Sequence, residues 1–163
     1  MAMTMAGAVT LPAGRERVWA ALNDPEMLKR SIPGCQELER TSDTGFSATA
    51  KISIGPVKAT FKGNVALSNI DPPNGYTISG EGQGGVAGFA KGGAKVRLEP
   101  AESGGTLLNY DVEAQVGGKI AQLGGRLING VAKKYADEFF ANFAKALEAH
   151  GAASAQPSQN SAA

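Results

Sequence analysis

The chain has 163 residues, with 16 basic and 15 acidic side chains, and 42% of its residues are hydrophobic. This length and composition are typical of one globular domain with an apolar core, and they exclude wholesale disorder. The net charge of +1 leaves no excess of positive charge for binding nucleic acid.

Two residue types that build metal and catalytic sites are scarce. Cys35 is the single cysteine and His150 the single histidine, which excludes a disulfide framework, a histidine or cysteine metal cluster and a Ser-His-Asp triad. No window approaches the roughly 20 apolar residues of a membrane span. Residues 1–7 lack the charged and apolar regions of a signal peptide, so we expect a cytoplasmic protein.

The N-terminal part predicts one strand followed by two short helices. Residues 3–11 place apolar side chains at every second position, which is typical of a strand. Residues 15–23 predict the first helix. Asp24 followed by Pro25 predicts the start of the second helix, with the aspartate as its N-cap, and residues 32–34 must end that helix.

From Cys35 onward the hydrophobic period is two, which predicts six further strands. The first of them begins at Cys35. The other five are expected at residues 46–54, 57–68, 76–82, 94–98 and 108–116. The short connections between them favour antiparallel pairing.

The glycine-rich run 80–93 is interpreted as flexible or bulged strands beside a cavity mouth, or as backbone packed closely on a helix. A phosphate-binding loop is disfavoured because the next segment reads as a strand rather than a helix.

The period returns to 3.6 residues over 119–149, which predicts one long amphipathic helix. Its apolar stripe is Ile120, Leu123, Leu127, Val131, Tyr135, Phe139, Phe143 and Ala146. Residues 1–149 are therefore expected to form a single domain, and residues 150–163 a disordered polar tail.

A curved antiparallel sheet that packs against one straight helix leaves space where it bends away. Many inward positions hold small residues, among them Ala48, Gly63 and Ala114. We therefore predict an apolar ligand cavity that is roomiest near Gly124 and Gly125, where Gln122 or Arg126 could orient a carbonyl group. A fully packed core is the alternative. The predicted lining is Trp19, Leu28, Ile32, Phe46, Ile52, Phe61, Phe89, Tyr110, Ile120, Leu123, Leu127 and Val131.

Several segments, in this order, resemble one protein family. They are Asp24-Pro25-Glu26 with Ser31-Ile32-Pro33-Gly34-Cys35, the run 55–63, the runs 80–85 and 88–92, and the run 115–124 with Asp137-Glu138-Phe139-Phe140. Together they closely resemble the family of the G subunit of carbon monoxide dehydrogenase, within the START-like, helix-grip (SRPBCC) superfamily, over about residues 2–147.

The resemblance implies an α+β helix-grip fold, with a seven-stranded curved antiparallel sheet, two short helices after the first strand and one long C-terminal helix. It implies a non-catalytic accessory protein that holds a quinone or lipid-like molecule and assists a molybdenum-containing carbon monoxide dehydrogenase-type hydroxylase. It supplies no catalytic residue, no metal site and no cofactor other than such a bound molecule.

Longer members of the family carry an apolar C-terminal segment that reaches the membrane, whereas residues 151–163 of this chain are polar. We therefore expect an indirect association with the inner face of the cell membrane, through the partner. A cyclase or aromatase-like enzyme and an interaction module without a ligand are the alternative functions.

Overall fold

The computed structural model describes the backbone of residues 1–162 and the side chains of residues 1–149. The side chains of the predicted polar tail, residues 150–163, lie outside the described part, and Ala163 lies outside it entirely. The disorder expected for that tail stays a prediction.

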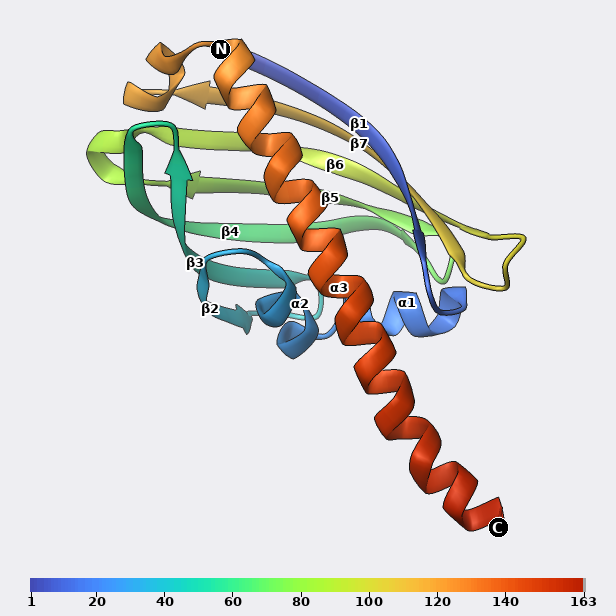
Figure 1. Ribbon diagram of the computed structural model, residues 1–163. Helices are drawn as coiled ribbons and strands as arrows, with labels where there is room; N and C mark the ends of the chain where they lie inside the picture. The colour runs from blue at the N-terminus through green and yellow to red at the C-terminus, as the bar shows by residue number, and fades with distance from the viewer. Residues whose placement is uncertain (163) are drawn as a thin grey trace.

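Seven strands form one antiparallel sheet in the order β1-β7-β6-β5-β4-β3-β2 (Figure 1). Their bounds are β1 Ala2–Leu11, β2 Cys35–Arg40, β3 Gly45–Ile54, β4 Val57–Asp71, β5 Gly75–Gln83, β6 Phe89–Pro100 and β7 Thr106–Gly117. Strands β2 to β7 are sequential neighbours because short turns join them. The predicted seven-stranded antiparallel sheet is confirmed, and the glycine-rich run 80–93 lies in a regular β5–β6 ladder interrupted only by a short turn.

The two short helices are α1 Arg15–Leu22 and α2 Pro25–Ser31. The side chain of Asp24 accepts a hydrogen bond from the backbone N–H of Glu26 at 3.0 Å, as the N-cap prediction required. Two 3-10 turns, η1 Gly85–Ala87 and η2 Lys119–Leu123, lie in the connections before β6 and after β7.

Helix α3 Gly125–Ala162 crosses one face of the sheet diagonally (Figure 1). Its later turns are tied to the short helices, because the Asn142 side chain donates to the carbonyl of Ser31 at 3.1 Å and Arg17 donates to the carbonyl of Leu147 at 2.8 Å. Among the described residues, no helix carries an apolar stretch long enough to cross a bilayer.

The long helix begins at Gly125, not at residue 119 as its periodicity predicts. Gly124 has φ 92° and ψ 153°, a backbone conformation that is essentially restricted to glycine and that ends the preceding turn η2. After this break, the residues of α3 that face the sheet are not the ones that a continuous helix from residue 119 would present. Ile128 is consequently buried, at 6% exposure, while Leu127 is 36% exposed.

Residues that pair directly across antiparallel strands point to the same face of the sheet. Along β4 the alternation of half-buried and exposed residues places Val57, Phe61 and Leu67 on the face that α3 covers, as predicted. We call this the inner face and the opposite one the outer face.

Candidate ligand-binding site

The inner face holds two separate core clusters rather than one continuous core. The first core cluster packs α1, α2 and the later turns of α3 on the sheet, and its buried residues are Leu11, Ala13, Val18, Ala21, Leu22, Met27, Phe46, Leu67, Tyr76, Val96, Leu98, Leu108, Tyr110, Phe143, Ala146 and Leu147. The second core cluster has the buried residues Ala87, Val116, Ile120 and Ile128. It packs η1, η2 and the first turns of α3 on the opposite end of the sheet.

Between the clusters, the inner face of the sheet carries mostly small residues. Two successive rows of cross-strand pairs run over β7, β6, β5, β4 and β3 in this region. One row is Ala114, Gly92, Gly80 and Val65, and the next is Ala90, Gly82, Gly63 and Ala48. At Gly92 a Cβ atom would collide with the carbonyl oxygen of Glu113, so the close approach of β6 and β7 requires glycine there.

The helix above these rows is also incompletely covered. Val131, Ala132 and Tyr135 lie on the side of α3 that carries Ile128 and Phe139, yet all three are only half-buried. Ile128 belongs to the second core cluster and Ala136 packs against the first, so about 12 Å of helix separates them at 1.5 Å per residue.

The two half-buried layers face each other, and we call the region between them the central gap. Its floor is the eight-residue pair of rows, and its roof is Val131, Ala132 and Tyr135. Protein interiors are normally close-packed, and side chains in a filled sheet–helix interface are buried. Floor and roof residues are half-buried rather than buried. Its lining is apolar, which suits an apolar molecule.

The predicted lining residues divide into four groups. Those of the first core cluster, or packed against it, are Trp19, Leu28, Phe46 and Tyr110. Those of the second are Phe61, Ile120 and Leu123. Ile32, Ile52 and Val131 are half-buried and belong to neither cluster, and Phe89 and Leu127 are exposed.

Two residues of that prediction do not line the space between sheet and helix. The β6 register turns Ala90 inward, so Phe89 lies on the outer face, 39% exposed, with its ring against Gly117. Leu127 lies against the turn at Gly55 because the break at Gly124 shifts the phase of α3.

The end of the molecule that was predicted to be roomy is packed instead. The end near Gly124 was expected to be roomy, but η1 and η2 close it by burying Ala87 and Ile120. The rows of small, half-buried residues lie instead in the middle of the sheet. Gln122 and Arg126 are exposed side chains and do not point into a buried cavity.

Aromatic side chains form the wall of the central gap on the side of the first core cluster. Tyr110 stacks on Phe140 with ring centroids 5.3 Å apart, and Phe139 contacts Phe140 edge to face at 5.0 Å. Trp19 and Tyr76 pack together deeper in the cluster, at 5.2 Å. Burial raises the pKa of Tyr76, so its hydroxyl stays protonated.

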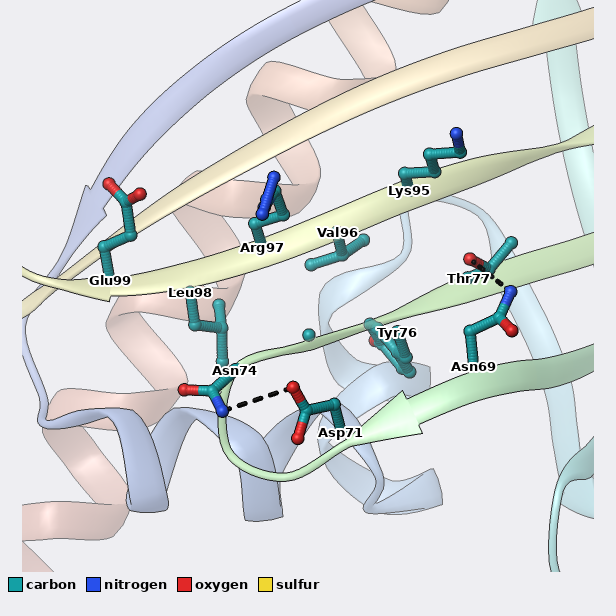
Figure 2. A pocket seen from close by; sticks show the side chains of 11 residues that line it. Asn69, Asp71, Asn74, Tyr76, Thr77, Lys95, Val96, Arg97, Leu98 and Glu99 are labelled. Atoms are coloured by element: carbon teal, nitrogen blue, oxygen red, sulfur yellow. Dashed lines mark hydrogen bonds between the residues drawn. The ribbon is translucent and has the colours of Figure 1, made fainter.

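The outer face carries hollows. One of about 330 Å³ lies at the β4–β5 turn. Figure 2 shows Lys95, Arg97 and Glu99 projecting from β6 beside it, with hydrogen bonds from Asn69 to Thr77 and from Asn74 to Asp71, each at 3.3 Å. Charges of both signs and a turn held by its own hydrogen bonds are typical of an ordinary solvated surface. Among the described residues, no three His, Cys, Asp or Glu side chains lie close enough to hold a metal ion.

Solved structures share this fold. A conserved protein from Geobacillus kaustophilus is 33% identical, with a TM-score of 0.84 over 90% of this chain and 95% of that chain. A START superfamily protein from Mycobacterium smegmatis is 16% identical, with a TM-score of 0.66 over 89% of this chain and 97% of that one. A Streptomyces aromatase/cyclase is 12% identical, with a TM-score of 0.67 over 91% and 94% of the two chains. The last two likenesses show the fold alone, which is START-like, as predicted.

No curated protein matches the chain. The family model described as the G subunit of carbon monoxide dehydrogenase (CoxG) matches residues 7–148, which include almost the whole sheet and the part of α3 that covers it. The chain therefore belongs to the CoxG family, named after the G subunit of carbon monoxide dehydrogenase.

Proposed function

We propose that the protein is a non-catalytic accessory module that holds an apolar molecule, a quinone or a lipid, in the central gap and assists a molybdenum-containing hydroxylase. The observation that carries the proposal is the pair of rows under α3, in which seven of the eight residues are glycine or alanine although two packed clusters flank them. An apolar guest in this space would remove exposed hydrophobic surface from water, which is favourable by about 25 cal/mol per Å².

Among residues 1–149, whose side chains are described, the groups that could move protons do not converge on this space, which supports a binding role over catalysis. The Tyr135 hydroxyl is hydrogen-bonded to the backbone of Ser53 at the sheet edge. Tyr110 lies against Gly7 and stacks on Phe140, and Arg126 is exposed. An aromatase-like reaction would need acids or bases aimed at a buried substrate.

The partner role rests on family membership. Carbon monoxide dehydrogenase is named in the family description, and the hydroxylase partner, with indirect membrane recruitment through it, is part of our proposal. The quinone or lipid would then be the molecule that the partner enzyme exchanges with this module.

Native mass spectrometry of the purified full chain tests the ligand. We expect a bound species that organic extraction releases as a quinone or lipid, or a mass shift on adding a short-chain ubiquinone. The absence of both would contradict the binding role and favour an interaction module without a ligand. Affinity purification from the source cells tests the partner, since a molybdenum enzyme should copurify, and a clean pulldown without one would contradict that part.

A further inference from the structure

One end of the molecule exposes apolar side chains that the fold does not use. Val86 is 93% exposed, Phe89 39% and Leu127 36%. Each comes from a different part of the chain: Val86 from η1, Phe89 from the start of β6 and Leu127 from the first turn of α3.

These segments meet at one place. The side chain of Leu127 lies against Gly55 in the β3–β4 turn, and the ring of Phe89 lies against Gly117 just before η2. The turns η1 and η2 contact each other, and η1 contacts β4. We call the surface formed by residues 54–58, 84–89 and 117–127 the loop end.

The backbone of η1 directs Val86 away from the protein. Gly85 and Gly88, with φ of 62° and 119°, bracket the turn. Ala87 is buried at 3% exposure in the second core cluster, so η1 is anchored through Ala87 while Val86 projects into solvent. A valine in this position contributes nothing to packing of the fold.

The charge of the loop end has one sign. Lys58, Lys119 and Arg126 are exposed there, and residues 54–58, 84–89 and 117–127 contain no aspartate or glutamate. The chain as a whole is nearly neutral, with 16 basic and 15 acidic residues. An uncompensated basic surface around projecting apolar side chains is complementary to an anionic surface with an apolar interior.

We propose that the loop end docks on an anionic lipid bilayer, with Val86, Phe89 and Leu127 entering the interface and Lys58, Lys119 and Arg126 facing the lipid headgroups. The exposed apolar groups stand on separate turns around a projecting tip. A specific protein partner needs a continuous contact of about 800 Å² on each side, whereas side chains enter a bilayer one by one.

The biological role of this docking rests on the proposed function of the central gap. The second core cluster lies directly beneath the loop end and closes one end of the central gap. Docking through the loop end would therefore bring the ligand-binding space to the bilayer, where quinones and lipids are dissolved. It would also give the chain a membrane contact of its own.

Vesicle flotation with the full chain tests the proposal. The probes are vesicles of phosphatidylcholine alone and of equal parts phosphatidylcholine and phosphatidylglycerol. We expect binding to the anionic vesicles only, weakened by salt. Val86→Glu should lower the affinity about tenfold or more, because a carboxylate replaces the inserting group and meets like charge.

Matched variants separate the loop end from general effects. Ile70→Glu alters another exposed aliphatic side chain, at 41% exposure, near the β4–β5 turn, and should bind vesicles as the unaltered chain does. Lys119→Glu with Arg126→Glu should abolish binding, while Lys95→Glu with Arg97→Glu on the outer face should retain it. Far-ultraviolet circular dichroism verifies that each variant is folded.

Each of these outcomes either supports or overturns docking through the loop end. Failure of the unaltered chain to float, equal binding to neutral and anionic vesicles, or equal losses for Val86→Glu and Ile70→Glu would overturn the proposal. Binding of short-chain ubiquinone to Val86→Glu in solution is measured in parallel and should be unchanged. A chain that floats but binds no ligand would refute the proposed function and leave docking in place. A chain that binds ubiquinone but does not float would refute docking and leave the proposed function in place.

Discussion

The hydroxyl oxygen of Tyr135 on α3 accepts a hydrogen bond from the backbone N–H of Ser53 on β3, with 2.9 Å between the two atoms. Strand β2 pairs with β3 only as far as Ala50, so the backbone of Ser53 is open on that side. Tyr135 fills this place and ties the helix to the sheet beside the central gap. The contact therefore helps to hold α3 in place over the central gap.

Replacing Tyr135 by phenylalanine removes this tie and keeps the ring. We expect the free energy of unfolding, measured in urea, to fall by about 0.5–1.5 kcal/mol. Ser53→Ala is the matched control and should leave the stability unchanged, because the bond uses the backbone of Ser53. Equal stability of Tyr135→Phe and the unaltered chain would show that the hydrogen bond does not hold the helix.

Phe143 is the anchor of α3 in the first core cluster, with 0% exposure, and it stacks on Phe139 at 5.6 Å. Phe143→Ala should lower the free energy of unfolding by about 3–5 kcal/mol, since it leaves a cavity as well as losing buried surface. Val86→Ala, at a site that is 93% exposed, should change it by less than about 0.5 kcal/mol. Similar effects of the two substitutions in urea unfolding would contradict the burial described for α3.

Two glycines near the start of α3 should respond with opposite signs. Gly124 has φ 92°, so Gly124→Ala is strained although no atom blocks its Cβ, and it should destabilise by about 1–3 kcal/mol. Gly130 lies within α3 with open space around it, so Gly130→Ala should stabilise by roughly 0.5–1 kcal/mol. Thermal unfolding measures the stability of both variants against that of the unaltered chain. Stabilisation by Gly124→Ala would mean that η2 and α3 form one continuous helix.

The thiol of Cys35 is half-buried, and its S–H donates to the carbonyl of Glu37 at 3.4 Å. Burial raises the pKa of Cys35, opposed by the positive charge of Lys29. Because the thiolate is the reactive form, alkylation by iodoacetamide at neutral pH should be slower in the folded chain than in urea. Lys29→Gln should slow it further.

The sign of the linked stability change follows from the raised pKa of Cys35. The folded chain holds the thiol proton more tightly than the unfolded chain does. The contribution to stability is therefore full below the unfolded thiol pKa and is lost as pH rises toward the folded value. Equal alkylation rates in the folded and unfolded chains would contradict the described burial.

The strands could be predicted from the sequence because side chains alternate between the two faces of a strand by covalent geometry. The alternation along β4 is the clearest case, and its predicted inward residues Val57, Phe61 and Leu67 do face α3. The N-cap at Asp24 was equally predictable, since it depends only on a local hydrogen bond.

The start of α3 was not predictable from periodicity. An apolar stripe continues through residues 119–131 at helical spacing, and a single positive φ at Gly124 decides that η2 and α3 are separate. Glycine can lie inside a helix or end a turn as Gly124 does. The hydrophobic spacing is the same in both cases, so it cannot tell them apart. The inward assignment of Leu127 failed for this reason.

The floor of the central gap was predicted in part. Ala48, Gly63 and Ala114 are predicted to face inward, whereas for Gly80 and Gly92 the sequence leaves open bulged strands or backbone packed closely on a helix. Their role becomes visible only when the register pairs Gly80 with Gly92, and Gly92 with Ala114. Register depends on contacts between distant segments, so no local pattern contains it. The same register places Phe89 on the outer face.

The most direct test of the central claim is calorimetric titration of short-chain ubiquinone into the full chain and two variants. Ala114→Leu places three extra carbon atoms on the floor of the central gap, whereas Ala66→Leu adds the same atoms at an exposed outer position of β4. We predict saturable binding to the unaltered chain and to Ala66→Leu, and a loss of about tenfold or more in affinity for Ala114→Leu. Equal affinities for all three chains, or no binding to any, would contradict a ligand site between the sheet and α3.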